Sequence, residues 1–253
     1  MFSKLVRSPI ALIALATLPL CACSSTDPIR LGNIEIEDPW ENYNRRAFNF
    51  NDSIDEAVAE PVARGYRNVT PEPIRVGIHN FLNNLKSPVQ VANQLLQGDI
   101  TGAADSLTRT FANTFFGLGG TVDIARMEGL EEDPEDFGQT LAVWGITDGP
   151  YLVVPFFGPA SVRDHTGTMV DAMADPLNRY WRNTDEHAWL YGRKSIELLD
   201  RRTELLDVLA DLKKNSLDYY ASVRSTVYQQ RHSLIRDGQR TEAAIEDFPE
   251  FED

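Results

Sequence analysis

Apolar residues recur at helical spacing through almost the whole chain, and this periodicity limits the possible folds more than any other feature. In residues 40–58, 72–86, 100–115 and 185–234, apolar side chains return every three or four positions, so they share one face of a helix. No segment shows the alternation that is typical of a half-buried strand. We therefore predict a mainly α fold with a single helical domain over residues 38–236 and no internal repeat.

Prolines and glycines mark the expected helix ends. Pro61 is expected to end the first helix, because proline lacks the N–H that a helix interior requires. Pro88, preceded by a serine, is expected to open a third helix that stops at Gly98. Asp99 and Ser161 are the expected N-caps of later helices.

Residues 149–159 are apolar and contain three prolines. Proline cannot donate to the hydrogen-bond ladder of a sheet, which excludes this run as a central strand. We expect a rigid, extended loop that is either buried or in contact with lipid.

The first 22 residues resemble a secretory signal peptide. Lys4 and Arg7 supply a basic start, and the apolar stretch from Ile10 to Leu20 follows. That stretch is about half the length of roughly 20 residues that a spanning helix needs. The alternative, an N-terminal anchor helix, is disfavoured by the short length and by Pro19.

Cys23 is the expected lipidation site. Leu20-Cys21-Ala22 before it resembles a bacterial lipobox, whereas cleavage before Cys21 would place the bulky Leu20 at the cut. Cleavage before Cys23 removes Cys21, so no free thiol and no disulfide would remain. Ser24 follows without an Asp beside the anchor, which by resemblance to known sorting rules favours the outer membrane, with the acyl chains in its periplasmic leaflet.

The body of the chain is acidic, with an expected spacer over residues 23–37 and an expected disordered acidic tail over residues 237–253. The formal net charge is −14, and it becomes −16 when Lys4 and Arg7 are lost with the signal peptide. This charge argues against nucleic acid as a partner and against docking to anionic headgroups by charge alone. Membrane contact beyond the Cys23 lipid must then come from apolar residues.

The segment from Phe111 to Ala125 contains a single charged residue, Asp123, and a glycine-rich turn. Two apolar arms around such a turn indicate an amphipathic hairpin that is too short to span a bilayer. The alternative is a hairpin buried in the core. Periodicity alone does not decide between them.

No catalytic or metal-binding motif stands out, and we predict a protein that is not an enzyme and has no metal or cofactor. The four histidines, at positions 79, 165, 187 and 232, lack metal-ligand spacing. The Gly-x-Ser-x-Gly elbow of lipases is absent. Ser161, Asp164 and His165 are neighbours in sequence, but a helix cap with solvated side chains explains them more simply than a nucleophile does.

Apolar surface with occasional cations suits a phospholipid, whose tails need an apolar path and whose phosphate needs polar contacts. Arg109 precedes Phe111, and Arg163 follows the proline-rich run. Each is a candidate headgroup contact, with a surface ion pair or a snorkelling side chain as the alternative. The candidate contacts for acyl chains are Phe111, Phe115, Phe116, Phe156 and Phe157.

The chain resembles the MlaA (VacJ) lipoproteins over about residues 38 to 215, with the family's motifs in the same order. The opening motif runs from Asp38-Pro39-Trp40 to Phe48-x-Phe50-Asn51. The other matching segments are Asn83-Asn84-Leu85-x-x-Pro88, Asn93-x-Leu95-Leu96-Gln97-Gly98, Arg109 to Asp123, Asp136-Phe137-Gly138-Gln139-Thr140-Leu141, Trp144-Gly145, Gly149-Pro150-Tyr151 and Gly158-Pro159-x-Ser161-x-Arg163-Asp164.

The resemblance implies a ring-like helical body in the inner leaflet of the outer membrane. Its amphipathic channel would let phospholipids that have strayed into the outer leaflet pass to a soluble periplasmic carrier, which feeds an inner-membrane ABC transporter. Family members associate with trimeric porins. Movement would be passive, with no covalent change.

Two further roles follow from the resemblance. Gly117, Gly119 and Gly120 are expected to act as the hinge of a gate formed by residues 111–123. Phe48, Asn49 and Phe50 are expected to support that gate. Two other functions remain as alternatives: an envelope phospholipase, which requires a nucleophile such as Ser161, and a structural lipoprotein that only braces porins.

Overall fold

The computed structural model describes residues 29–31 and 34–237, and it confirms the mainly α prediction. The expected signal peptide, Cys23 and the acidic tail beyond residue 237 lie outside the described residues. The α-helices are α1 (Glu41–Ile54), α2 (Glu60–Val69), α3 (Glu72–Gln97), α4 (Ile100–Phe115), α5 (Ile124–Met127), α6 (Phe137–Val143), α7 (Val162–Ala174), α8 (Pro176–Asn183), α9 (His187–Glu204), α10 (Leu206–Asn215) and α11 (Tyr219–Asp237).

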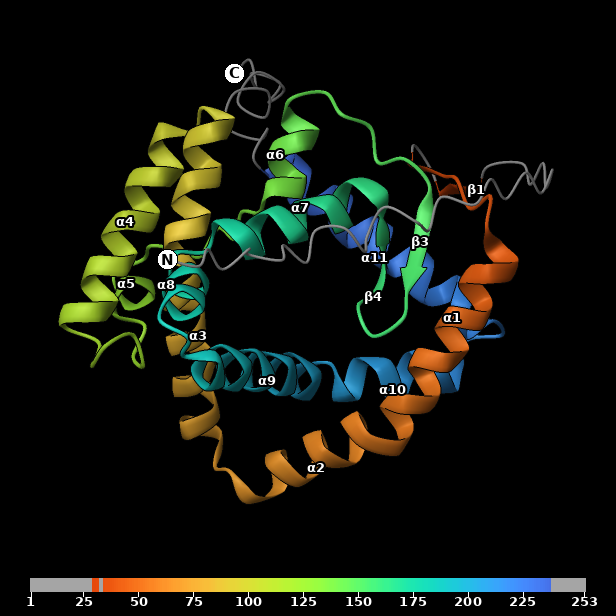
Figure 1. The fold of residues 1–253 in the computed structure, drawn as a ribbon, viewed down its shortest axis with the longest axis horizontal. Helices are drawn as coiled ribbons and strands as arrows, with labels where there is room; N and C mark the ends of the chain where they lie inside the picture. The colour runs from red at the N-terminus through yellow and green to blue at the C-terminus, as the bar shows by residue number, and fades with distance from the viewer. Residues whose placement is uncertain (1–28, 32–33, 238–253) are drawn as a thin grey trace, which may run out of the picture.

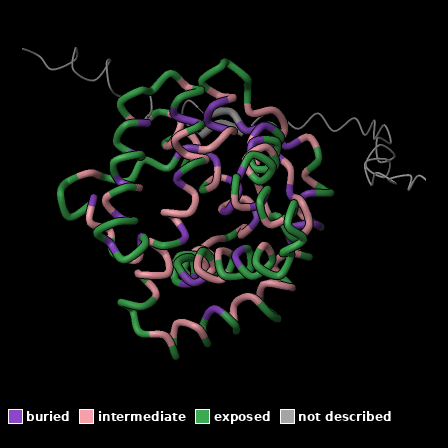
Figure 2. The backbone as a smooth tube through the Cα atoms, turned by 60° about the vertical axis from the view of Figure 1, so that its left-hand side comes forward, coloured by how far each residue is buried: buried purple, intermediate pink, exposed green. Residues whose placement is uncertain are grey.

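The helices have a ring-like outline. Figure 1 shows α3, α7, α1 and the α9–α10 pair arranged around the centre of the view, with α2 below and α4 on the outside of α3. Figure 2 shows that exposed stretches predominate and that buried stretches are short and scattered through the frame. The molecule is therefore a frame of amphipathic helices, with much of its apolar surface left uncovered.

The prediction that Pro61 ends the first helix is wrong. A π-helical segment, η2 (Asp55–Ala59), links α1 to α2 without a break, and Pro61 falls in the first turn of α2. The wider π-turn changes the local hydrogen-bond register, and the first turn of a helix tolerates a residue without an N–H.

The predicted boundary at Pro88 is also wrong, because α3 continues through it as one helix. Helix α3 packs against α4, α6 and α9, and this tertiary packing outweighs the cost of an interior proline. The expected end at Gly98 is confirmed: its φ of 85° is the left-handed conformation that glycine adopts readily. The N-caps are confirmed as well, since Asp99 accepts from the amide of Gly102 and Ser161 from that of Asp164.

Two short antiparallel hairpins correct the expectation that strands are absent. One pairs β1 (Ile29–Leu31) with β2 (Ile34–Ile36), and the other pairs β3 (Tyr151–Val154) with β4 (Gly158–Ser161). The second lies in the run that we expected to be an unpaired loop, with Val153 opposite Pro159. Both strands of a two-stranded sheet are edges, so a proline is tolerated there.

The core lies where β2, β3, α1 and α11 meet. The side chain of Asn44, fully buried in α1, donates to the carbonyl of Tyr151 at 2.9 Å and accepts from the amide of Val153 at 2.9 Å. The side chain of Asn44 thus provides hydrogen-bond partners for the two backbone groups of β3 that face the core. The buried apolar cluster around it comprises Ile36, Ala47, Phe48, Tyr151, Val153, Tyr220, Val223 and Tyr228.

Ion pairs join the beginning of the described chain to its end. Each spans well over a hundred residues and connects the α1–η2 region, or the segment just before it, with α9 to α11 or the linkers between them. The pairs are Asp38–Arg224, Arg45–Asp218, Asp52–Lys213 and Asp55–Arg202.

Candidate functional site

Helix α4 presents its apolar face to solvent. Phe115 is 72% exposed and Phe116 is 77% exposed, and the rings of Phe111 and Phe115 stack with centroids 5.9 Å apart. The alternative of a hairpin buried in the core is therefore wrong. The side chains line an open, shallow hollow of about 630 Å³ formed by Leu107, Thr108, Phe111, Ala112, Phe115 and Phe116.

The opposite face of α4 is polar and buried. The guanidinium of Arg109, a residue only 8% exposed, donates to Asp123 at 2.8 Å and to the carbonyl of Leu130. Asn113 donates to the same carboxylate at 2.9 Å and accepts from the amide of Ala125. Burial alone would raise the pKa of Asp123, but these hydrogen bonds outweigh it and hold the pKa below its usual value. The segment after the turn is thereby fixed to α4.

The turn between α4 and α5 requires its glycines. A Cβ on Gly117 would lie 2.1 Å from the carbonyl oxygen of Val122, and one on Gly120 would lie 2.7 Å from the side chain of Asn84. Gly119 and Gly120 have φ values of 73° and 96°, which glycine adopts without strain. The backbone amide of Gly120 donates to the backbone carbonyl of Asn113 at 2.8 Å, so the turn is tied to the helix end. A hinge at these glycines stays a prediction.

A small polar cavity of about 30 Å³ lies beneath this turn. That volume has room for water and not for a phospholipid headgroup. Its walls come from α3, α4 and the segment after the turn: Asn80, Asn83, Asn84, Ser87, Gln90, Ser106, Arg109, Asn113, Asp123, Glu132 and Asp133.

Besides the α4 face, a second exposed apolar patch is formed by Phe156 and Phe157 at the tip of the β3–β4 hairpin. The ring of Phe156 meets Phe50 edge to face at 5.4 Å. Asn51 of α1 donates to the carbonyl of Val154 at 3.1 Å and accepts from the amide of Phe156 at 2.8 Å. Helix α1 therefore holds this tip in place.

The expected support of the α4 turn by Phe48, Asn49 and Phe50 is not what the structure shows. Helices α1 and α4 lie on opposite sides of the ring (Figure 1). Phe48 is buried against Tyr219 with ring centroids 5.2 Å apart, and Phe50 contacts the β3–β4 tip. Asn49 is exposed. Phe48 and Phe50 therefore support the hairpin of residues 151–161, and α1, which carries them, lies far from the α4 turn.

Arg163 is buried in a carboxylate network. Its guanidinium pairs with Asp148 and, at 3.0 Å, with Asp164. Asp164 also accepts from Arg231 of α11 at 3.0 Å. Contact of Arg163 or Arg109 with a headgroup stays a prediction, and a phosphate would have to displace a carboxylate to reach either one.

Ser161 and His165 do not form a nucleophile and base pair in this structure. The Ser161 hydroxyl oxygen is buried and caps α7 by accepting from the amide of Asp164 at 3.1 Å. The ring of His165 bonds to the carbonyl of Leu152 at 3.0 Å. This geometry matches the cap interpretation.

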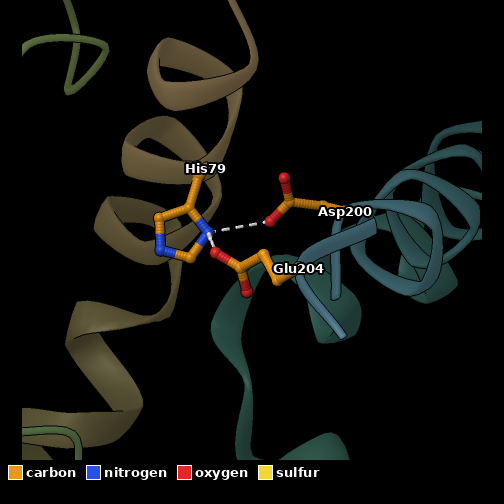
Figure 3. Close-up of side chains that lie close together, drawn as sticks. All are labelled: His79, Asp200 and Glu204. Carbon is orange, nitrogen blue, oxygen red and sulfur yellow. Dashed lines mark hydrogen bonds and ion pairs between the residues drawn. The ribbon is translucent and has the colours of Figure 1, made fainter. Parts of the chain in front are cut away.

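A cluster that the sequence did not reveal joins α3 to α9. Nδ1 of His79 lies 2.9 Å from Oδ2 of Asp200 and 3.0 Å from Oε1 of Glu204. Figure 3 shows both carboxylates turned toward the same ring nitrogen. His79 and Asp200 are 121 positions apart, so spacing along the chain could not detect them. The only available signal was the placement of Asp200 and Glu204 one helical turn apart.

Within the described residues, no helix combines the length and hydropathy that a membrane span requires.

Comparison with known proteins places these features in context. Residues 36–234 match the sequence model of a family described as MlaA lipoprotein. The chain is 35% identical over 238 residues to the intermembrane phospholipid transport system lipoprotein MlaA of Shigella flexneri, covering 90% of this chain and 89% of that one. It is 33% identical over 205 residues to an uncharacterised protein of Rickettsia prowazekii, covering 81% and 80% of the two chains.

A solved structure also resembles the chain, with a TM-score of 0.66 and 36% sequence identity. The match covers 79% of this chain and 98% of the other, whose description reads "Structural basis for maintenance of bacterial outer membrane lipid asymmetry". The agreement therefore extends over nearly the whole helical body.

Proposed function

Because the chain belongs to the MlaA lipoprotein family, we propose that it transports phospholipids in the bacterial envelope and maintains the lipid asymmetry of the outer membrane. Its relatives are named as lipoproteins of an intermembrane phospholipid transport system. In this proposal, phospholipids that have reached the outer leaflet pass through the protein toward the periplasm without covalent change.

The exposed apolar face of α4 is the observation that carries the proposal. Its stacked phenylalanines continue into the exposed turn at Phe116 and Leu118. In water, exposing so much contiguous apolar surface is costly, and such surface is typical of a membrane or ligand contact. A chain with a net charge of −14 cannot gain this contact by attraction to anionic lipids.

Cys23 is the proposed membrane anchor, with its acyl chains in the periplasmic leaflet of the outer membrane. Each buried CH₂ of an acyl chain contributes about 0.8 kcal/mol, so several chains hold a protein stably without a spanning helix. The α4 face and the tip at Phe156 and Phe157 then enter the acyl region or meet the tails of the transported lipid.

In this proposal, the polar side of α4 holds the turn in its closed position. Arg109, Asn113 and Asp123 tie the glycine turn to the helix, so the turn presents its apolar residues in one defined position. Opening of this turn at Gly117, Gly119 and Gly120 is the proposed gating step. The proposed partners are a trimeric outer-membrane porin and a soluble periplasmic carrier that feeds an inner-membrane ABC transporter.

The test uses the purified, acylated protein in liposomes that contain labelled phospholipid, with the soluble carrier outside. Analysis by mass spectrometry should find intact phospholipid on the carrier, dependent on this protein and unchanged by Ser161→Ala. Lysophospholipid or free fatty acid would identify a phospholipase. Absence of any transfer, with porin binding retained, would identify a porin-bracing scaffold.

A further inference from the structure

In the cluster of His79, Asp200 and Glu204, two carboxylate acceptors would have to share the single proton of one ring nitrogen. A ring nitrogen carries at most one proton, yet two carboxylate oxygens converge on Nδ1 of His79 at 2.9 and 3.0 Å. The three potential ligand atoms all lie within 4.8 Å of one another. One imidazole nitrogen and two carboxylate oxygens around one point favour a cation at that point.

We propose that these three residues bind a divalent transition-metal ion of the zinc class, which fastens α9 to α3. Zinc accepts imidazole nitrogen and carboxylate oxygen at about 2.0–2.2 Å, in tetrahedral geometry. The edges of such a tetrahedron are about 3.3 Å long, so the observed separations of 2.9 and 3.0 Å require only a small expansion. Water occupies the fourth position.

The donor set distinguishes zinc from the commoner hard cations. Calcium takes six to eight oxygen ligands and magnesium requires a near-ideal octahedron of oxygens. Three protein donors that include an imidazole suit neither ion, whereas imidazole is a preferred ligand of zinc, copper and nickel.

A second group orients the imidazole from its other side. Nε2 of His79 lies 2.9 Å from the side-chain amide of Asn83 on the next turn of α3. When Nδ1 binds a metal, Nε2 carries the proton, and the amide can rotate to present its oxygen to that proton. Metal-bound histidines in proteins have such a partner almost without exception.

The cluster is open to solvent on one side and negative in charge. The Asp200 side chain is 13% exposed and that of Glu204 is 52% exposed. Glu132, from the loop after α5, adds a further negative charge that acts on His79. An ion can therefore enter past Glu204 and is attracted on the way.

The position of the cluster gives the metal a structural role. It lies between α3 and α9, whereas the buried apolar cluster lies at β2, β3, α1 and α11. A bound ion would secure a side of the ring that lies away from this buried apolar cluster. This inference is independent of the proposed transport function.

The test is zinc binding by the full-length protein purified without a polyhistidine tag. After dialysis against chelator and then zinc, elemental analysis should find one zinc per chain. Zinc at about 100 times its dissociation constant should raise the melting temperature by about 5–10 °C, and magnesium should not. Cobalt in place of zinc should give the visible absorption of a four-coordinate site.

Three variants decide whether this cluster is the site. His79→Gln and Asp200→Asn should lose the zinc-dependent shift, while Glu204→Gln, at the exposed position, should keep the fold and weaken zinc binding by roughly tenfold or more. His187→Gln is the matched control, because His187 is an exposed histidine 3.8 Å from Asp185 and should change nothing. Absence of zinc binding in the parent protein, or zinc affinity at the parental level in folded Glu204→Gln and His79→Gln, would overturn the proposal.

Discussion

Asn113 in α4 and Asp123 beyond the glycine turn are joined by a hydrogen bond of 2.9 Å, and the same carboxylate receives Arg109 at 2.8 Å. The turn that carries Phe116 and Leu118 outward is thus fixed from its inner side. The exposed apolar residues and the buried polar ones are two faces of one structural unit.

Replacing Asp123 by Ala should destabilise the protein strongly. Arg109 would keep its buried position and lose its carboxylate, and breaking such a pair costs about 3–5 kcal/mol. The measurement is urea denaturation followed by circular dichroism. Asp207→Ala is the control, since Asp207 pairs with Arg67 at the surface and its loss should leave the midpoint unchanged. Equal effects of the two substitutions would show that the inner contacts do not hold the turn.

Gly119 and Gly120 should differ in their tolerance of a side chain. Both have positive φ, so Ala at either costs about 1 kcal/mol from backbone conformation. A Cβ at Gly120 would also collide with Asn84, whereas one at Gly119 meets nothing within 4 Å. Gly120→Ala should therefore lower the melting temperature more than Gly119→Ala, as calorimetry would measure.

The gating role of the turn has its own test. Val at both Gly119 and Gly120 restricts the backbone of the turn and should slow transfer of phospholipid to the carrier. The readout is lipid asymmetry in cells that express the variant at parental levels. Unchanged asymmetry would contradict the hinge.

Replacing Phe115 and Phe116 together by Ser should reduce lipid transfer and leave the fold intact. Both side chains are largely exposed, so the substitutions remove little area that is buried in the folded protein. They do remove the free energy of burying these rings among acyl chains, which is about 25 cal/mol per Å² of apolar surface. We expect at least a tenfold slower transfer in the liposome assay, with the melting temperature preserved. Leu217→Ser is the control, because Leu217 is a fully exposed apolar residue in the linker before α11. A control that slows transfer as much would refute a special role for α4.

Stability should fall in acid through Asp136. Its carboxylate binds Arg231 at 2.5 and 2.6 Å. Burial alone would raise the pKa of Asp136, but the bonds and charge of Arg231 outweigh burial and keep the pKa below its usual value. A carboxyl with a lowered pKa stabilises the fold above its unfolded pKa of about 3.9, and this contribution disappears as the pH falls through the folded pKa.

Urea midpoints measured from pH 7 downward should show this loss below about pH 4. Arg231→Met should lower the midpoint at pH 7 and flatten the acid limb. An acid limb of the same steepness in Arg231→Met would mean that other carboxylates account for the loss.

The helical class, the caps at Asp99 and Ser161, and the end at Gly98 could be predicted because each depends on residues that are close in sequence. The predictions at Pro61 and Pro88 were wrong. A π-turn before Pro61 lets the helix continue, and packing of α3 on three neighbouring helices offsets the cost of Pro88 in its interior. The β3–β4 hairpin was missed, because pairing in a two-stranded sheet tolerates prolines that a wider sheet excludes.

The candidate site was predictable in part. Phe111, Phe115 and Phe116 could be selected as apolar, but only the fold shows that they face outward. Periodicity does not reveal that Arg109 is held by Asp123 and Arg163 by Asp148, because both aspartates lie outside the helices. The contacts of Phe48 and Phe50 depend on how α1 packs against β3. The contacts of His79 depend on α9, which follows it in the chain by more than a hundred residues.

The long-range ion pairs bear on the order in which the chain can fold. The ion pair of Asp55 with Arg202 spans 147 residues, and that of Arg45 with Asp218 spans 173 residues. Neither pair can form until the later residue has been synthesised. Contacts of such high sequence separation form slowly, because each must overcome the entropy of a long loop. During synthesis α1 to α4 emerge before their partners, with the phenylalanines of α4 already exposed. The chain is therefore prone to aggregate in this interval. Because the phenylalanines of α4 stay exposed in the folded structure, that surface would need shielding even after α11 has arrived.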